Sequence, residues 1–169
     1  MTISMHSASV PGFARLLANM GNWLDAARAH AEVKKFDPAV YMTLRLAPDM
    51  LPLPRQIQIC SDAAKGCIAR LAGQEVPSWP DDETTLEQLA ARIARTRDFV
   101  LSVPAEAVNG SEEREIVIPR RDAEPRRFKG EFYLHHFALP NFYFHATTTY
   151  ALLRQAGVPL GKMDFLGAV

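Results

Sequence analysis

Apolar residues recur with helical spacing over four long segments, and this pattern constrains the fold more than any other feature of the chain. Over residues 9–30, one side carries Phe13, Leu16, Leu17, Met20, Trp23, Leu24 and Ala27. Residues three and four apart lie on one face of a helix, so this segment is predicted to be an amphipathic helix. Pro11 suits its first turn. Pro38 ends the helical run, because the residue before a proline is pushed out of helical backbone.

The second and third segments show the same spacing. The second begins near Pro52 or Pro54 and ends before Gly73, with an apolar face of Ile57, Cys60, Ala64, Cys67, Ile68 and Leu71. The third is expected to open on Thr84-Thr-Leu-Glu87, a capping box in which hydroxyl and carboxylate satisfy free backbone N–H groups. Pro104 stops it, and its apolar face is Leu86, Leu89, Ala90, Ile93 and Val100.

The fourth helix begins either at Pro140 or near Glu131 with a kink at the proline, and the sequence leaves both starts open. Gly157 ends it, at a position that favours left-handed backbone. Its apolar face consists of Phe142, Ala146, Thr149 and Leu153.

A short β-hairpin is predicted between the third and fourth helices. Ile116 and Ile118 alternate with polar residues at the spacing of a strand, and residues 126–128 can return as its partner. The basic cluster in the turn is interpreted as solvated, with anion binding as the alternative; it consists of Arg120, Arg121, Arg126 and Arg127.

Four amphipathic helices in 169 residues predict one all-α domain over residues 1–169, a four-helix bundle with this possible hairpin. Nineteen basic and nineteen acidic residues give a net charge of zero. A dedicated nucleic-acid-binding protein normally carries a basic excess, so that class is not expected. No window reaches the roughly 18 uninterrupted apolar residues of a membrane span, so no membrane partner is expected either.

The cytoplasm is the expected compartment. The first residues, Met1 to His6, contain neither a basic region nor an apolar stretch of the kind that directs secretion. Cys60 and Cys67 lie about 10 Å apart along the predicted second helix, too far for a disulfide. We therefore expect two buried, reduced thiols.

The histidines carry the possible chemistry, but regular backbone limits which of them can meet. His135 and His136 diverge on a helix and on a strand, so they cannot both bind one ion. Asn141 and His145 are four residues apart and share one face of the fourth helix. A phosphate-binding loop is rejected for residues 157–162, because the spacing is one residue short.

Several separated blocks of the chain resemble an uncharacterised bacterial family, a domain of unknown function in the DinB/YfiT-like superfamily. These blocks are Arg45-Leu-Ala-Pro-Asp-Met50, residues 56–65, Pro140-Asn-Phe-Tyr-Phe-His145 and residues 157–167. The resemblance implies an up-down-down-up four-helix bundle that is often a homodimer. It also implies kinship with metalloenzymes, including thiol-dependent transferases and isomerases.

In typical DinB-like proteins, three histidines bind a divalent cation, one from the second helix and a pair four residues apart on the fourth. This resemblance implies candidate ligands at His145, Asn141 and either Gln56 or Gln58. Periodicity favours Gln56, which shares a side with Cys60, whereas Gln58, Asp62 and Lys65 lie on another face. Because amides are weak, hard ligands, replacing two imidazoles with them should forfeit tight binding of zinc or nickel.

Other candidates for a binding pocket lie around these positions. Tyr143 carries a hydroxyl able to take part in proton transfer, although an aromatic residue here also suits a core. Charged residues outside the helices, in the blocks that carry the resemblance, are candidates for function or for holding the C-terminal tail to the bundle. They are Asp49, Lys162 and Asp164.

Two hypotheses follow, and no catalytic residue is assigned under either. The favoured one is a small-molecule-binding or stress-related protein whose former metal site has become a polar hydrogen-bond network. The alternative is a metal- or thiol-dependent transferase or isomerase of the DinB-like type, with a divalent metal as cofactor.

Overall fold

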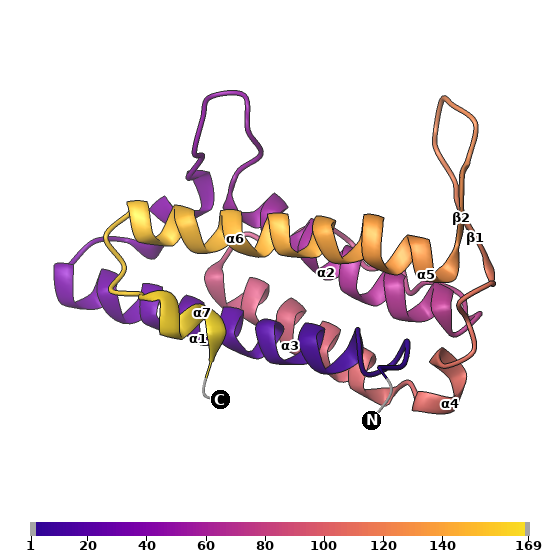
Figure 1. The fold of residues 1–169 in the computed structure, drawn as a ribbon. Helices are drawn as coiled ribbons and strands as arrows, with labels where there is room; N and C mark the ends of the chain where they lie inside the picture. The colour runs from indigo at the N-terminus through magenta and orange to yellow at the C-terminus, as the bar shows by residue number, and fades with distance from the viewer. Residues whose placement is uncertain (1–2, 168–169) are drawn as a thin grey trace.

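Each of the four apolar stripes lies on a long helix, and the helices pack against one another along these stripes. The computed structural model describes residues 3–167 (Figure 1). The long helices are α1 Val10–Lys34, α2 Leu53–Leu71, α3 Leu86–Ser102 and α6 Leu139–Gln155. Together they confirm the predicted all-α four-helix bundle.

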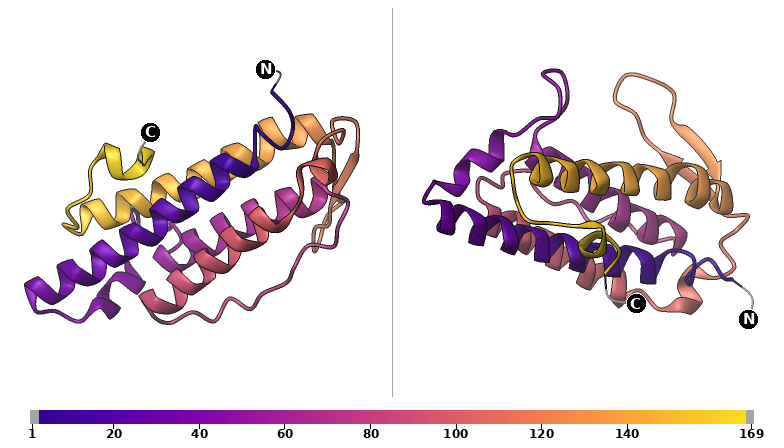
Figure 2. Two further views of the ribbon diagram at one scale, coloured as in Figure 1. Left: turned by 90° about the horizontal axis from the view of Figure 1, so that it is seen from below. Right: turned by 60° about the vertical axis from the view of Figure 1, so that its left-hand side comes forward.

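The four helices run up, down, down and up. Helices α1 and α6 point one way and α2 and α3 the other, with α1 packed on α3 and α2 packed on α6 (Figures 1 and 2). Because α2 and α3 are parallel, the chain between them must return along the length of the bundle, as the left view of Figure 2 shows. We call this return segment, residues 72–85, the strap.

A buried arginine fastens the strap to α3. The side chain of Arg92 is 2% exposed, and its guanidinium lies 2.8 Å from Glu83, 2.9 Å from Asp81 and 3.2 Å from Asp62. It also donates to the carbonyl of Pro80 at 2.9 Å. These contacts tie two strap carboxylates and one strap carbonyl to a single side chain, so a long loop without secondary structure keeps a fixed path.

An aromatic side chain in the strap adds a second attachment. The ring of Trp79 lies 5.0 Å from the ammonium of Lys65 on α2 and 4.3 Å from the guanidinium of Arg95 on α3. Cations attract the face of an indole ring, so Trp79 links the strap to both helices beneath it.

The remaining elements are short. The predicted hairpin is confirmed, with Ile116 opposite Phe128 in the antiparallel pair. Gly130 follows it directly, and a Cβ atom there would lie 1.9 Å from the carbonyl oxygen of Ser111, so only glycine fits. The short elements are η1 Pro38–Thr43, α4 Ala105–Val108, β1 Glu115–Ile118, β2 Arg126–Lys129, α5 Gly130–Tyr133, η2 Leu134–Ala138 and α7 Lys162–Leu166.

The fourth helix begins near Glu131, the earlier of the two predicted starts. Helical backbone begins at Gly130 in α5 and continues through a π-helical turn, η2, into α6. This wide turn ends at Ala138, two residues before Pro140. Pro140 has no N–H to donate, and its ring crowds the carbonyl four residues earlier. Gly157 follows α6 with a φ of 91°, as its predicted role requires.

The capping box of the third helix was predicted one residue too early. The N-cap is Thr85, whose hydroxyl accepts from the backbone N–H of Gln88 at 3.2 Å. The Gln88 carboxamide oxygen accepts from the backbone N–H of Thr85 in return, also at 3.2 Å. Glutamine serves in this motif as well as glutamate does, so the neighbouring pair Thr84 and Glu87 is not needed.

The C-terminal segment docks on α1 through α7. The indole N–H of Trp23 donates to the carbonyl of Asp164 at 2.9 Å, and Phe165 stacks on the same indole at 5.5 Å. Residues 168 and 169 lie outside the described residues. Across residues 3–167, none of the helices has the length and hydrophobicity needed to cross a membrane.

Glu83→Gln tests the attachment of the strap. The substitution keeps the shape but removes the charge that faces the buried Arg92, so we expect the free energy of unfolding near neutral pH to fall by about 1–3 kcal/mol. Urea unfolding followed by tryptophan fluorescence measures it. Glu113→Gln is the control, because Glu113 is 85% exposed and its ion pair with Lys129 should contribute little.

The difference in unfolding free energy between the native protein and Glu83→Gln has a defined pH dependence. Burial by itself would raise the pKa of Glu83, but hydrogen bonds from Arg92 and Gln58 outweigh burial and lower the pKa below its ordinary value of 4.5. The stability that this carboxylate contributes is therefore complete above pH 4.5 and is lost as the pH falls through the lower, folded-state pKa. A stability difference from Glu83→Gln that did not shrink on acidification would contradict this assignment.

Candidate functional site

A histidine and a glutamine meet where α6 packs on α2. Nδ1 of His145 lies 2.7 Å from Oε1 of Gln56, and both side chains are buried. Each lies on its helix at the edge of the apolar stripe, so packing the two helices brings them together. This contact confirms that Gln56, rather than Gln58, faces the fourth helix.

The hydrogen bonds of Gln56 fix which nitrogen of His145 carries the proton. Nε2 of Gln56 donates to the carbonyl of Leu51 at 2.9 Å, and a carbonyl can only accept. The amide oxygen must then face His145, so Nδ1 of the imidazole is the donor in that bond. In the neutral ring, Nε2 is therefore an unprotonated acceptor.

The surroundings of His145 favour the neutral ring. Burial lowers the pKa of His145 below its ordinary value of 6.5, because the charged form loses solvation. Its Nε2 has no protein hydrogen-bond partner among residues 3–167, and it is not one of the fully buried atoms without a partner. Nε2 thus remains in contact with solvent as a free acceptor.

The cysteines near this pair are inert. Cys60 lies one turn beyond Gln56 on α2, and its thiol lies 3.6 Å from the carbonyl of Phe142. Both Cys60 and Cys67 are buried and unpaired, as predicted, and burial raises the pKa of each thiol. Neither can supply a thiolate near neutral pH.

The donors around His145 do not suit a transition metal. Asn141 lies one turn before His145 on the same side of α6 and is half-buried, but its amide makes no hydrogen bond within the described part of the chain. Gln56 already uses its oxygen for His145 and its nitrogen for Leu51. No group of three His, Cys, Asp or Glu residues that could hold a metal occurs in residues 3–167.

Gln58, Asp62 and Lys65 lie on the opposite side of α2 and belong to the strap attachment. Gln58 donates to Glu83 at 2.8 Å, and Lys65 pairs with Asp62 at 2.7 Å. These residues contact the strap or Arg92 and do not reach His145. The structure separates the candidate residues of α2 into two networks.

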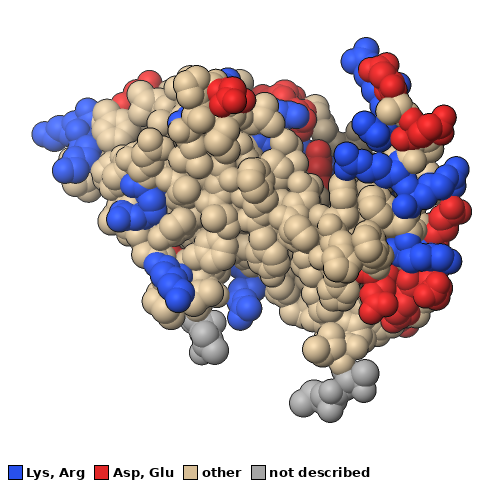
Figure 3. All heavy atoms as spheres, turned by 45° about the horizontal axis from the view of Figure 1, so that its top comes forward, with Lys and Arg blue, Asp and Glu red and all other residues tan. Residues whose placement is uncertain are grey.

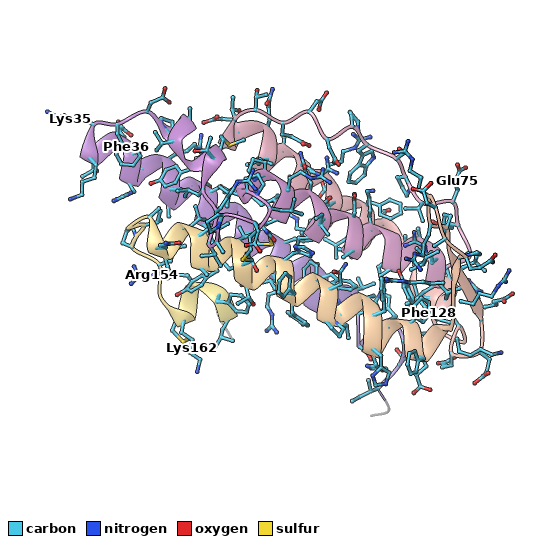
Figure 4. The ribbon with its side chains drawn as sticks, turned by 90° about the horizontal axis from the view of Figure 1, so that it is seen from above. Lys35, Phe36, Glu75, Phe128, Arg154 and Lys162 are labelled. Atoms are coloured by element: carbon cyan, nitrogen blue, oxygen red, sulfur yellow. The ribbon has the colours of Figure 1, made fainter. Side chains whose placement is uncertain are left out.

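The charged candidates outside the helices lie away from His145. Asp49 is exposed in the turn between η1 and α2. Lys162 is exposed at the start of α7 and points away from the bundle (Figure 4). The Asp164 carboxylate accepts from the backbone N–H of Gly161 at 2.6 Å, so it caps the short helix α7.

A groove of about 380 Å3 runs along α6, and His145 is not among the residues that line it. Phe144 lines it, and the ring of Phe144 packs at right angles to the imidazole with the centroids 5.1 Å apart. Tyr143 also lines the groove and is 42% exposed. The lining contains no charged side chain; it consists of Leu46, Pro140, Tyr143, Phe144, Thr147, Thr148 and Ala151.

Sequence reasoning missed three parts of these networks. Leu51 takes part through its carbonyl, which no sequence pattern reveals. Thr149 was assigned to the apolar stripe, and its hydroxyl donates to the carbonyl of His145 at 2.9 Å. Arg92 could have been found, because it lies three residues after Leu89 and four before Thr96, in phase with the interior face of α3.

The comparisons with known proteins agree with this geometry. Residues 5–166 match the family described as Domain of unknown function (DUF1993). The chain belongs to this family. A search of the curated proteins found no match.

The chain is similar over nearly its whole length to a solved structure. The matched structure is the crystal structure of a DinB family member protein from Shewanella denitrificans, with a TM-score of 0.88 and 37% sequence identity. The alignment covers 97% of this chain and 92% of that one. The two matches confirm an uncharacterised, DinB-like family with the predicted fold.

Gln56→Leu tests the energetic role of the pair. It keeps the approximate volume but leaves Nδ1 of His145 and the carbonyl of Leu51 without their partner, so we expect a loss of about 1–3 kcal/mol in the free energy of unfolding. Urea unfolding measures it. Gln155→Leu, at an exposed position near the end of α6, should change stability by less than about 0.5 kcal/mol.

Proposed function

We propose that this DinB-like protein binds a small molecule at the α2–α6 seam without a tightly bound metal. The observation that carries the proposal is the hydrogen bond of Gln56 to His145. This bond occupies Oε1 of Gln56, the atom that would bind a cation. It leaves Nε2 of the neutral His145 ring free as an acceptor. A small-molecule pocket combines apolar walls with a few polar groups, and this helix carries both a free acceptor and an apolar groove.

The chemistry of the donors argues against a tight zinc or nickel site. Zinc sites normally combine three or four imidazole, thiolate or carboxylate ligands, whereas here one imidazole is joined by two carboxamides. To bind an ion through its amide oxygen, Gln56 would have to weaken or give up the bond that this oxygen accepts from His145. That exchange costs a buried hydrogen bond for one weak ligand.

The alternative is a metal- or thiol-dependent transferase or isomerase. It requires an activated thiol, which neither buried cysteine supplies, so the thiol would have to come from a second molecule and be activated by a metal. Turnover of a thiol conjugate, or a stoichiometric metal in the purified protein, would favour this alternative.

Restoring histidines at the two amide positions tests the proposal. We expect the native protein to bind Zn2+ or Ni2+ weakly, and the double variant Gln56→His with Asn141→His to bind at least ~100-fold more tightly, because three imidazoles then converge. Isothermal titration with each metal measures it. Asn22→His with Gln155→His, at exposed positions on α1 and α6, is the matched control. Tight binding by the native protein would contradict the proposal.

We further propose a cytoplasmic location and a stress-related role that depends on the ligand. The two free, buried cysteines support the location, since reduced thiols persist in a reducing compartment. The stress-related role follows if the ligand is a compound that accumulates under stress, and it is tested by growth of a deletion strain under thiol-reactive stress.

We also propose that two copies associate through the outer face of α6. No Asp, Glu, Lys or Arg occurs in residues 132–153. Three large side chains of this stretch are exposed: Phe132 by 55%, Tyr143 by 42% and Phe144 by 57%. Figure 3 shows the corresponding face as a largely uncharged surface, with charged side chains gathered over the hairpin. Large exposed aromatic side chains on an uncharged face are typical of a protein–protein contact.

Phe132→Glu tests the association. Phe132 lies in α5, at the start of this uncharged stretch. A carboxylate buried there in a contact would have no partner, so we expect a dimer to become a monomer in light scattering after size-exclusion chromatography. Val33→Glu, which alters an exposed residue at the far end of α1, should leave the molecular mass unchanged. A native protein that is monomeric at ~100 μM would overturn the proposal.

A further inference from the structure

A cavity of about 260 Å3 lies between α1 and the C-terminal segment that docks on it (Figures 1 and 2). Helix α1 supplies one wall, which includes Asn19 and Ala26, and residues 159–167 supply the other, which includes Asp164 and Gly167. A protein cavity of about 150 Å3 already holds a benzene molecule, so this cavity has room for a small organic ligand.

The side chain of Asn19 presents a hydrogen-bond acceptor to this cavity. Asn19 is 8% exposed, and its Nδ2 donates to the carbonyl of Phe165 at 3.0 Å. A carbonyl can only accept, so this bond fixes the orientation of the amide. Oδ1 of Asn19 makes no hydrogen bond among residues 3–167, and it is not one of the unpartnered atoms that are closed to solvent. A Cβ atom at Gly167 would lie 3.0 Å from Oδ1, so the glycine keeps this acceptor open.

The carboxylate of Asp164 adds a negative charge to the same cavity. One of its oxygens accepts from the backbone N–H of Gly161 at 2.6 Å, and the indole N–H of Trp23 donates to its main-chain carbonyl at 2.9 Å. These two bonds fix the position of Asp164 and leave its other carboxylate oxygen available. The carboxylate forms no ion pair within residues 3–167. The lining residues include no Lys or Arg, and Lys162 points away from the bundle (Figure 4).

The cavity therefore combines two oxygen acceptors, one of them charged, with the apolar walls of Ala26, Leu160 and Met163. An ammonium group carries three donors and a positive charge, so it can satisfy both acceptors while an attached alkyl chain packs on these walls. An anion would meet the carboxylate without an opposite charge. A hard metal ion such as Ca2+ takes about six to eight oxygen ligands, more than this cavity supplies.

We infer that the cavity between α1 and residues 159–167 binds a protonated primary alkylamine, whose ammonium group donates to Oδ1 of Asn19 and to the carboxylate of Asp164. This site shares no residue with the α2–α6 seam, so it is independent of the proposed function. The charge of Asp164, which is not needed to cap α7, acquires a role in selecting a cation.

Three probes with four-carbon chains separate the possible ligand classes. Butylammonium is a cation that donates, 1-butanol is neutral, and butanoate is an anion. We expect butylammonium to bind the native chain at least ~10-fold more tightly than either of the others at equal ionic strength, since a hydrogen bond to a charged group contributes a factor of this size. This comparison needs no variant.

The indole N–H signals in a 15N–1H NMR titration locate the binding. The chain has two tryptophans, and only Trp23 lines the cavity. We expect butylammonium to move the Trp23 signal, whose N–H donates to Asp164, and to leave the Trp79 signal of the strap in place. The spectrum of Trp79→Phe assigns the two signals.

Three variants assign the parts of the cavity. Asp164→Asn keeps an acceptor for the cap but removes the charge, so the preference for butylammonium over 1-butanol should fall at least ~5-fold. Asp98→Asn, the matched control on α3 with a side chain that is 70% exposed, should leave the preference unchanged. Ala26→Leu fills the cavity from α1 and should abolish the binding of all three probes.

Several results would overturn this assignment. They are equal binding of butylammonium and 1-butanol, tighter binding of butanoate, an unchanged preference in Asp164→Asn, or a Trp23 signal that stays in place at millimolar butylammonium. Failure of the proposed function is a separate outcome, because tight binding of zinc by the native chain would overturn that proposal and leave the amine titration unaffected.

Discussion

The hydrogen bond from Nδ1 of His145 to Gln56 determines what the α2–α6 seam can do. The carbonyl of Leu51 orients the amide of Gln56, the amide fixes the tautomer of the imidazole, and the tautomer leaves an acceptor at the exposed nitrogen. Each link follows from which atoms can donate and which can only accept. If the amide were reversed, the exposed nitrogen would carry the proton and the site would select for acceptors.

Helix α2 separates two polar systems that the sequence places close together. Gln56 faces α6, whereas Gln58, two residues later, faces the strap. The contacts of the strap involve many charged side chains, centred on the buried Arg92. The residues that line the groove include no charged side chain. The up-down-down-up topology explains the strap, because two parallel neighbouring helices require a long return segment that must be fastened somewhere.

Much of the fold could be predicted because apolar periodicity and helix-ending residues are local signals. The four helices, the hairpin and the role of Gly157 follow from residues within one or two turns of one another. The one-residue error at the third helix arose because Thr84 and Thr85 both suit an N-cap, and only the side chain of Gln88 selects between them. The start of the fourth helix depends on a π-helical turn, which has no sequence signature.

The site was predictable only in part, for a physical reason. Periodicity placed Gln56 and His145 on the correct faces, and the resemblance to DinB-like proteins brought them together. The tautomer depends on a backbone carbonyl in a loop, and the groove depends on the path of that loop past Phe144. Such contacts join residues far apart in sequence, so the chain shows no pattern for them.

The most direct test of the central claim is the protonation state of each ring nitrogen of His145, measured by 15N NMR of histidine-labelled protein at neutral pH. The tautomer with a protonated Nδ1 and a bare Nε2 is the predicted result, and Gln56→Leu should abolish the preference. A protonated Nε2 with a bare Nδ1, or a ring charged at both nitrogens, would contradict the account.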